Sequence, residues 1–131
     1  IPAKGNSLFL TVDRQDRELS LTVRATSTDG TWVVVRANSH QRIILELNDK
    51  GSARTILQGP AGAVTGPTLP TGSYKVGDRI AFGATGNTGY VSINGVQKLE
   101  LPDLMGNTFP LCGVMNAGAG FAWDDLVVKA L

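Results

Sequence analysis

The stretch Gly89–Leu104, GYVSINGVQKLELPDL, decides the fold that we predict for this chain. It begins with alternating apolar and polar residues, turns at Asn94-Gly95, resumes as a second strand-like run and meets a proline, Pro102. Two strand-like runs joined by Asn-Gly are the strongest short-range signal of a β-hairpin. We therefore predict strands over 89–94 and 96–100. The remaining question is whether this hairpin carries a site or only supports the fold.

Similar runs recur along the whole chain. They are rich in Val, Ile and Thr, return at intervals of about ten residues, and are bounded by turn-forming residues, which is typical of antiparallel sandwiches. Segment 59–73, GPAGAVTGPTLPTGS, is so rich in Gly and Pro that we predict a long surface loop there. The fold predicted is all-β, a two-sheet antiparallel β-sandwich (jelly roll). Its other strands are expected at 7–12, 18–26, 31–37, 42–48, 53–58, 79–85, 110–115 and 121–129.

Composition limits the number of domains and the kinds of partner. A chain of 131 residues with 42% hydrophobic residues suits a single domain over 1–131, and its start at Ile1 leads us to expect a module of a larger protein. Twelve Lys and Arg residues are interspersed with eleven Asp and Glu residues, so we expect no nucleic-acid partner. Apolar runs all fall short of the roughly 18 residues of a spanning helix, so we expect no membrane insertion.

The residues needed for common catalytic sites are scarce. The single histidine, His40, falls in a predicted turn, and no nucleophile elbow is present, so a nucleophilic triad is not expected. Cys112 has apolar neighbours and is predicted to be a buried core residue. Only three glutamates occur, and no strand places two acids on one face as a glycosidase cluster would. We predict a protein that is not an enzyme and needs no cofactor.

The adjacent carboxylates Asp124 and Asp125 leave two interpretations open. They can contribute to a calcium site with loop carbonyls, or one of them can cap a turn or pair with a backbone amide or an arginine. The second interpretation is favoured, and no metal site is predicted.

Because side chains alternate between the two faces of a strand, each predicted strand divides into a core set and an outer set. Trp32 and Trp123 lie in apolar strands and are expected in the core or at its edge, although such rings also stack on sugars. If the strands concerned are neighbours in one sheet, their outer face either binds a ligand or is simply solvated. The predicted core residues are Ile43, Leu45, Leu47, Ile80, Phe82, Val91 and Ile93. The candidate ligand-binding residues of the outer face are Arg36, Arg42, Glu46, Tyr90 and Asn94.

Three longer stretches resemble one known family. They are WVVVRANSHQRIILELNDKGSARTIL (32–57), YKVGDRIAFGATGNTGYVSINGVQKL (74–99) and FAWDDLVV (121–128). Their order of strands and turns is similar to that of the concanavalin A-like (laminin G-like) jelly-roll domains of lectins and glucanases. The resemblance implies two curved sheets with ligands on the concave face or rim loops. The acidic catalytic run of the glucanases in that family is absent here.

Three functions are therefore weighed. The first is a noncatalytic recognition module that binds a carbohydrate or another cell-surface polymer. The second is a structural or assembly domain, such as a phage or viral decoration or tail module, whose partners are neighbouring protein chains. The third and least favoured is a glycoside hydrolase. The first two imply an extracellular or virion-associated location.

Overall fold

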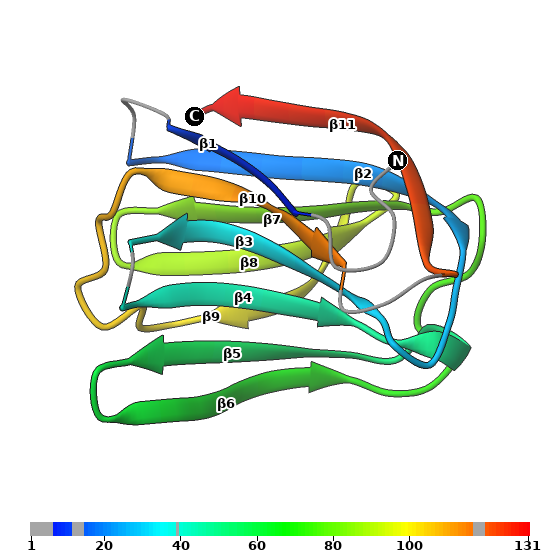
Figure 1. The fold of residues 1–131 in the computed structure, drawn as a ribbon, viewed down its shortest axis with the longest axis horizontal. Coiled ribbons are helices and arrows are strands. Elements are labelled where there is room, and N and C mark those ends of the chain that lie inside the picture. Colours follow the sequence, from blue (N-terminus) through cyan, green and yellow to red (C-terminus); the bar gives the residue numbers. More distant parts are fainter. Residues whose placement is uncertain (1–6, 12–14, 39, 117–119) are drawn as a thin grey trace.

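The computed structural model describes residues 7–11, 15–38, 40–116 and 120–131, which form a two-sheet antiparallel sandwich and confirm the all-β jelly-roll prediction. Figure 1 shows the sheets stacked face to face. The six-stranded sheet has the order β1-β10-β3-β4-β5-β6, and the five-stranded sheet has the order β11-β2-β7-β8-β9. The first contains β1 (Ser7–Thr11), β3 (Thr31–Ala37), β4 (Arg42–Leu47), β5 (Ala53–Gly59), β6 (Gly62–Leu69) and β10 (Leu111–Asn116). The second contains β2 (Arg17–Ala25), β7 (Arg79–Thr85), β8 (Thr88–Ile93), β9 (Val96–Leu101) and β11 (Ala122–Ala130).

The core lies between the two sheets, where alternate residues of nearly every strand meet. On β3, Val33 and Val35 face this core, whereas Val34 between them belongs to a second, smaller apolar cluster on the other side of the sheet. Such alternation is what a strand with period two dictates. All seven predicted core residues lie in the main cluster, as do Cys112 and Trp123.

Turn chemistry sets the register of the central hairpin. Asn94 and Gly95 both have positive φ, 51° and 82°, which is the geometry of the tight turn that the Asn-Gly pair predicts. Between β4 and β5 the chain turns through η1, a short 3₁₀ helix at Asp49–Gly51. Among the described residues, no helix is long and apolar enough to span a membrane.

The predicted loop over 59–73 is wrong for most of its length, because Gly62–Leu69 forms β6 and pairs with β5. β6 is the edge strand of its sheet, and an edge strand tolerates a proline whose missing N–H would break a central ladder. Pro67 lies beside a register shift, and its carbonyl accepts a hydrogen bond from Thr55 Oγ1 at 2.8 Å. Gly and Pro thus mark a sheet edge here.

Candidate functional site

The five candidate ligand-binding residues do not share one face. Arg42 and Glu46 lie on β4 in the six-stranded sheet, whereas Tyr90 lies on β8 in the five-stranded sheet. Asn94 forms the β8–β9 turn, and Arg36 is completely buried. The single outer face that we expected to hold all five is therefore wrong, because β4 and β8 belong to different sheets.

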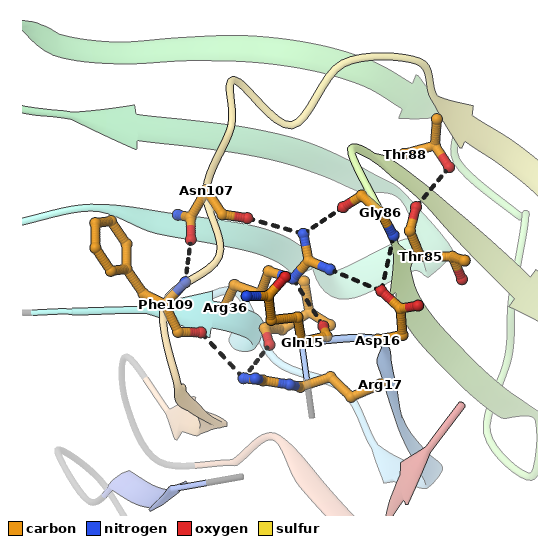
Figure 2. Close-up of polar contacts among 10 residues, drawn as sticks. Gln15, Asp16, Arg17, Arg36, Thr85, Gly86, Thr88, Asn107 and Phe109 are labelled. Atoms are coloured by element: carbon orange, nitrogen blue, oxygen red, sulfur yellow. Dashed lines mark hydrogen bonds and ion pairs between the residues drawn. The ribbon is translucent and has the colours of Figure 1, made fainter. Parts of the chain in front are cut away.

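Arg36 is directed into the protein by a β-bulge. The pairing of β3 with β4 shifts between Val34 and Arg36, and a bulge of this kind re-aims the following side chain. Figure 2 shows the guanidinium among backbone carbonyls: its Nε donates to Gln15 O at 2.9 Å, and its Nη1 donates to Gly86 O at 2.6 Å and to Asn107 O at 2.8 Å. Arg36 therefore joins three chain segments at one end of the sandwich, and its predicted place on the outer face is wrong.

A second buried arginine, Arg17, lies beside Arg36 (Figure 2). Its Nη1 donates to Phe109 O at 3.2 Å and to Pro110 O at 2.9 Å. Burial lowers the pKa of Arg36, the charge of Arg17 lowers it further, and Asp16 opposes both effects. The two arginines thus hold the loop that precedes β10 against the rest of the fold.

Asn94 uses both ends of its side-chain amide inside the protein. Its Oδ1 accepts from the backbone N–H of Arg79 at 2.8 Å, and its Nδ2 donates to Asp78 Oδ1 at 3.0 Å. The hydrogen bond from Asn94 is the main reason why the pKa of Asp78 is lowered. These contacts fix the hairpin to the neighbouring turn, so the geometry of Asn94 is that of a fold-shaping residue.

Tyr90 lies across the five-stranded sheet. A Cβ atom placed on Gly83 of β7 would lie 2.2 Å from Tyr90 Cζ, so the ring occupies the space that a side chain there would need. The Tyr90 hydroxyl donates to Glu18 Oε2 on β2. Burial, followed by the neighbouring Glu18, raises the pKa of Tyr90. The Tyr90 ring therefore packs over Gly83, and its hydrogen bond to the Glu18 carboxylate fixes it there.

The outer face of the six-stranded sheet carries a different cluster, which we call the Trp–Glu–Arg cluster: Trp32, Glu46 and Arg54. These residues stand side by side on β3, β4 and β5. Trp32 Nε1 donates to Glu46 Oε2 at 2.9 Å, while Arg54 Nε donates to Glu46 Oε1 at 3.0 Å and its Nη2 to Oε2 at 3.3 Å. The Glu46 side chain is 15% exposed and that of Arg54 is 48% exposed, so the cluster faces solvent through the arginine.

Beside this cluster runs an apolar row, followed by a second polar row. Val34, Ile44 and Ile56 are paired across β3, β4 and β5 and form a cluster against which Trp32 packs. Two residues further along β4 and β5 are Arg42 and Gln58, which pair with each other. Arg42 and Glu46 therefore share a face, as predicted, with the apolar row between them.

Sequence reasoning missed Arg54 and weighed Trp32 mainly as a core residue. Both lie opposite Glu46 only because of the register of three strands, and registers are set by turns and by burial of the whole sheet. The alternation of β5 could have identified Arg54, because its neighbours Ala53 and Thr55 are buried and its own side chain must point to the opposite, outer face.

Other candidate chemistry has structural roles. Asp124 Oδ1 accepts from Arg24 Nε at 2.8 Å, and Asp125 Oδ2 accepts from Arg24 Nη2 at 3.4 Å, so the predicted pairing with an arginine is confirmed. Within the part of the chain that the structure describes, no three His, Cys, Asp or Glu residues are grouped so that they could hold a metal ion. Cys112 is buried as predicted, and burial raises the pKa of its thiol.

These strand orders and faces define a concanavalin A-like jelly roll, the fold that the sequence resemblance implies. No family model and no curated protein sequence matches the chain. Among solved structures, it is similar to the carbohydrate-binding module CBM66 from Bacillus subtilis, with a TM-score of 0.72 and 10% identity over 98% of this chain and 84% of that one.

Two animal lectins are also similar. The homodimeric agglutinin CG-16 from chicken liver has a TM-score of 0.70 and 14% identity, with 95% of this chain and 100% of that chain covered. The galectin LEC-6 from Caenorhabditis elegans has a TM-score of 0.72 and 11% identity, with 98% and 92% covered. At such low identities these likenesses establish the fold, and function has to be argued from the site.

Proposed function

We propose that this protein is a carbohydrate-recognition module that binds a glycan on the outer face of its six-stranded sheet. The observation that carries the proposal is the Trp–Glu–Arg cluster, in which an indole, a carboxylate and a guanidinium from adjacent strands are joined by hydrogen bonds and face solvent through Arg54. The occurrence of the same fold in a carbohydrate-binding module and in galectins supports it.

The chemistry of the cluster matches that of a sugar. Sugar hydroxyls both donate and accept hydrogen bonds, and Arg54 supplies donors while Glu46 supplies acceptors. The Trp32 ring adds apolar surface of the kind that packs against the C–H face of a sugar. Because two hydrogen bonds from Arg54 already hold Glu46, less conformational freedom is lost when a ligand binds.

The same geometry favours binding without cleavage. Glycoside hydrolysis requires two carboxyl groups that flank the scissile bond, one of them acting as a proton donor. Glu46 is the single carboxylate of the Trp–Glu–Arg cluster, and both of its oxygens accept hydrogen bonds from the other two members. We therefore assign the cluster to recognition.

The test combines an array of neutral and acidic glycans with calorimetric titration of the best hit. Glu46→Gln and Arg54→Ala should each weaken binding about tenfold or more, equivalent to ~1.4 kcal/mol. Two matched controls should leave affinity unchanged. Glu18→Gln alters the glutamate that accepts from Tyr90 on the other sheet. Arg24→Ala removes an ion-paired arginine whose side chain is 47% exposed, against 48% for Arg54.

Two results would contradict the proposal. One is an array without any hit for the folded wild-type protein. The other is a hit whose affinity falls with Glu18→Gln or Arg24→Ala as much as with the cluster variants, because the glycan would then bind elsewhere.

A further inference from the structure

A groove of about 250 Å³ opens where the β5–β6 hairpin meets the loop between β9 and β10. Its apolar lining includes Ile43, Leu57 and Leu104, which are almost completely buried. Two further lining residues, Val64 and Met105, are 59% and 63% exposed, so the opening of the groove carries exposed apolar surface. The groove thus combines a buried apolar floor with exposed apolar walls.

The loop that forms one wall is held in place by side-chain hydrogen bonds. Asp103 Oδ1 accepts from Met105 N at 2.7 Å, Asn87 Oδ1 accepts from Gly106 N at 2.8 Å, and Asn87 Nδ2 donates to Asp103 at 2.8 Å. Met105 is held at φ 58°, a left-handed conformation that few non-glycine residues adopt. These hydrogen bonds hold the exposed Met105 side chain among the residues that line the groove.

The polar lining of the groove consists of amides. Asn107 is only 5% exposed, and its Oδ1 accepts from Phe109 N at 3.0 Å. Its Nδ2 donates to none of the described residues, as Figure 2 shows for the residues drawn. Gln41 and Gln58 contribute two further amides, and none of the described lining residues is charged. An amide that can still donate a hydrogen bond, above an apolar floor, suits a neutral ligand that has both hydroxyls and an apolar face.

We propose that this groove is a second subsite for the same glycan and binds one neutral sugar residue of an oligosaccharide. This inference rests on the proposed function. Gln58 links the two sites, because it lines the groove and is also the β5 partner of Arg42 on the outer face. Arg54 and Gln58 are four residues apart on β5, about 13 Å at a rise of ~3.3 Å per residue. A monosaccharide cannot reach from one site to the other.

The size of the groove agrees with a single ring. An apolar cavity of about 150 Å³ holds benzene, and pockets for drug-sized ligands begin at about 300 Å³. At about 250 Å³, the groove lies between these limits. We therefore expect the affinity to rise with the length of the oligosaccharide until one of its sugar residues enters the groove, and then to level off.

The test uses mono-, di-, tri- and tetrasaccharides of glucose, galactose and mannose, titrated against the wild-type protein, two groove variants and one control variant. Ala63→Phe adds a ring at an exposed residue of β6 that lines the groove, and Ala130→Phe adds the same ring at an exposed position on β11 as its control. Asn107→Asp keeps the acceptor for Phe109 N–H but removes the free amide donor. Thermal unfolding of each variant verifies that it is folded.

We expect the wild-type protein to bind a tri- or tetrasaccharide at least about tenfold more tightly than the matching monosaccharide. Ala63→Phe should abolish this advantage, Asn107→Asp should reduce it several-fold, and Ala130→Phe should leave it intact. Glycans that bind with the same affinity at every length, or an advantage that survives both groove variants, would overturn this inference and leave the proposed function standing. Failure of all these neutral sugars to bind would also overturn this inference, whereas the proposed function would fall only if the array of neutral and acidic glycans gave no hit either.

Discussion

Both outer faces of the sandwich carry an aromatic residue that donates a hydrogen bond to a glutamate. On the six-stranded sheet, Trp32 donates to Glu46, and on the five-stranded sheet, Tyr90 donates to Glu18. The surroundings differ: Glu46 is also bound by Arg54, whereas the ring of Tyr90 covers a glycine on the neighbouring strand.

The residue beneath each aromatic ring distinguishes a candidate binding site from a ring that only fills space on the sheet. Tyr90 fills the space above Gly83, so its ring repairs a gap in the sheet surface. Trp32 stands next to Ile44 and Ile56, whose own side chains already fill the face, and its cluster adds polar groups beyond what packing needs. A hydrogen bond between an aromatic residue and a glutamate therefore does not by itself indicate a binding site. The residues that the aromatic ring packs against have to be considered as well.

The largest expected effect comes from separating the two sheets at Arg36. Arg36→Met removes the donors for carbonyls of three segments, and buried carbonyls left without partners cost about 1–3 kcal/mol each. We expect the free energy of unfolding to fall by about 3 kcal/mol in urea titrations. Arg24→Met, at an exposed arginine, should change it by less than about 1 kcal/mol. Equal losses for the two variants would show that Arg36 does not join the sheets.

The second prediction concerns the cover on the five-stranded sheet. Gly83→Ala places a Cβ atom within 2.2 Å of Tyr90 Cζ, so the ring has to move and lose its bond to Glu18. We expect a loss of about 2 kcal/mol in the free energy of unfolding. In a Tyr90→Ser background the same substitution should cost little, because the clash is gone. A full loss in that background would mean that Gly83 is required for another reason.

The third prediction uses pH to separate the two aromatic residues. In the unfolded chain the pKa of Tyr90 is about 10, and in the folded state it is raised above that value. Folding therefore favours the protonated hydroxyl. This contribution is complete below about pH 10 and is lost as pH rises above that value. Urea unfolding at increasing pH should therefore show falling stability, with a shallower fall in Tyr90→Phe. Trp32→Phe should keep the wild-type slope, since the indole does not titrate; an unchanged slope in Tyr90→Phe would contradict this assignment.

The sequence predicted which residues alternate but not which strands become neighbours. Core residues such as Val91 and Ile43 could be identified because period-two alternation fixes a face within one strand. Glu46 and Tyr90 were expected on one face, and only the order of the strands shows that they lie on different sheets. Arg36 was misplaced because a bulge adds one residue to the alternation, and no local signal in the sequence marks that bulge.

The smallest expected effect concerns the Trp–Glu–Arg cluster itself. A double-mutant cycle of Glu46→Gln and Arg54→Ala should give a coupling of less than about 1 kcal/mol in urea unfolding, because Arg54 is half exposed and exposed ion pairs contribute little. Moderate salt should reduce the coupling further. The small effect on the free energy of unfolding contrasts with the effect on glycan affinity, because we expect the same substitutions to weaken binding about tenfold. A cluster with strong coupling in stability and none in binding would be a structural brace, as Tyr90 and Glu18 are on the opposite face.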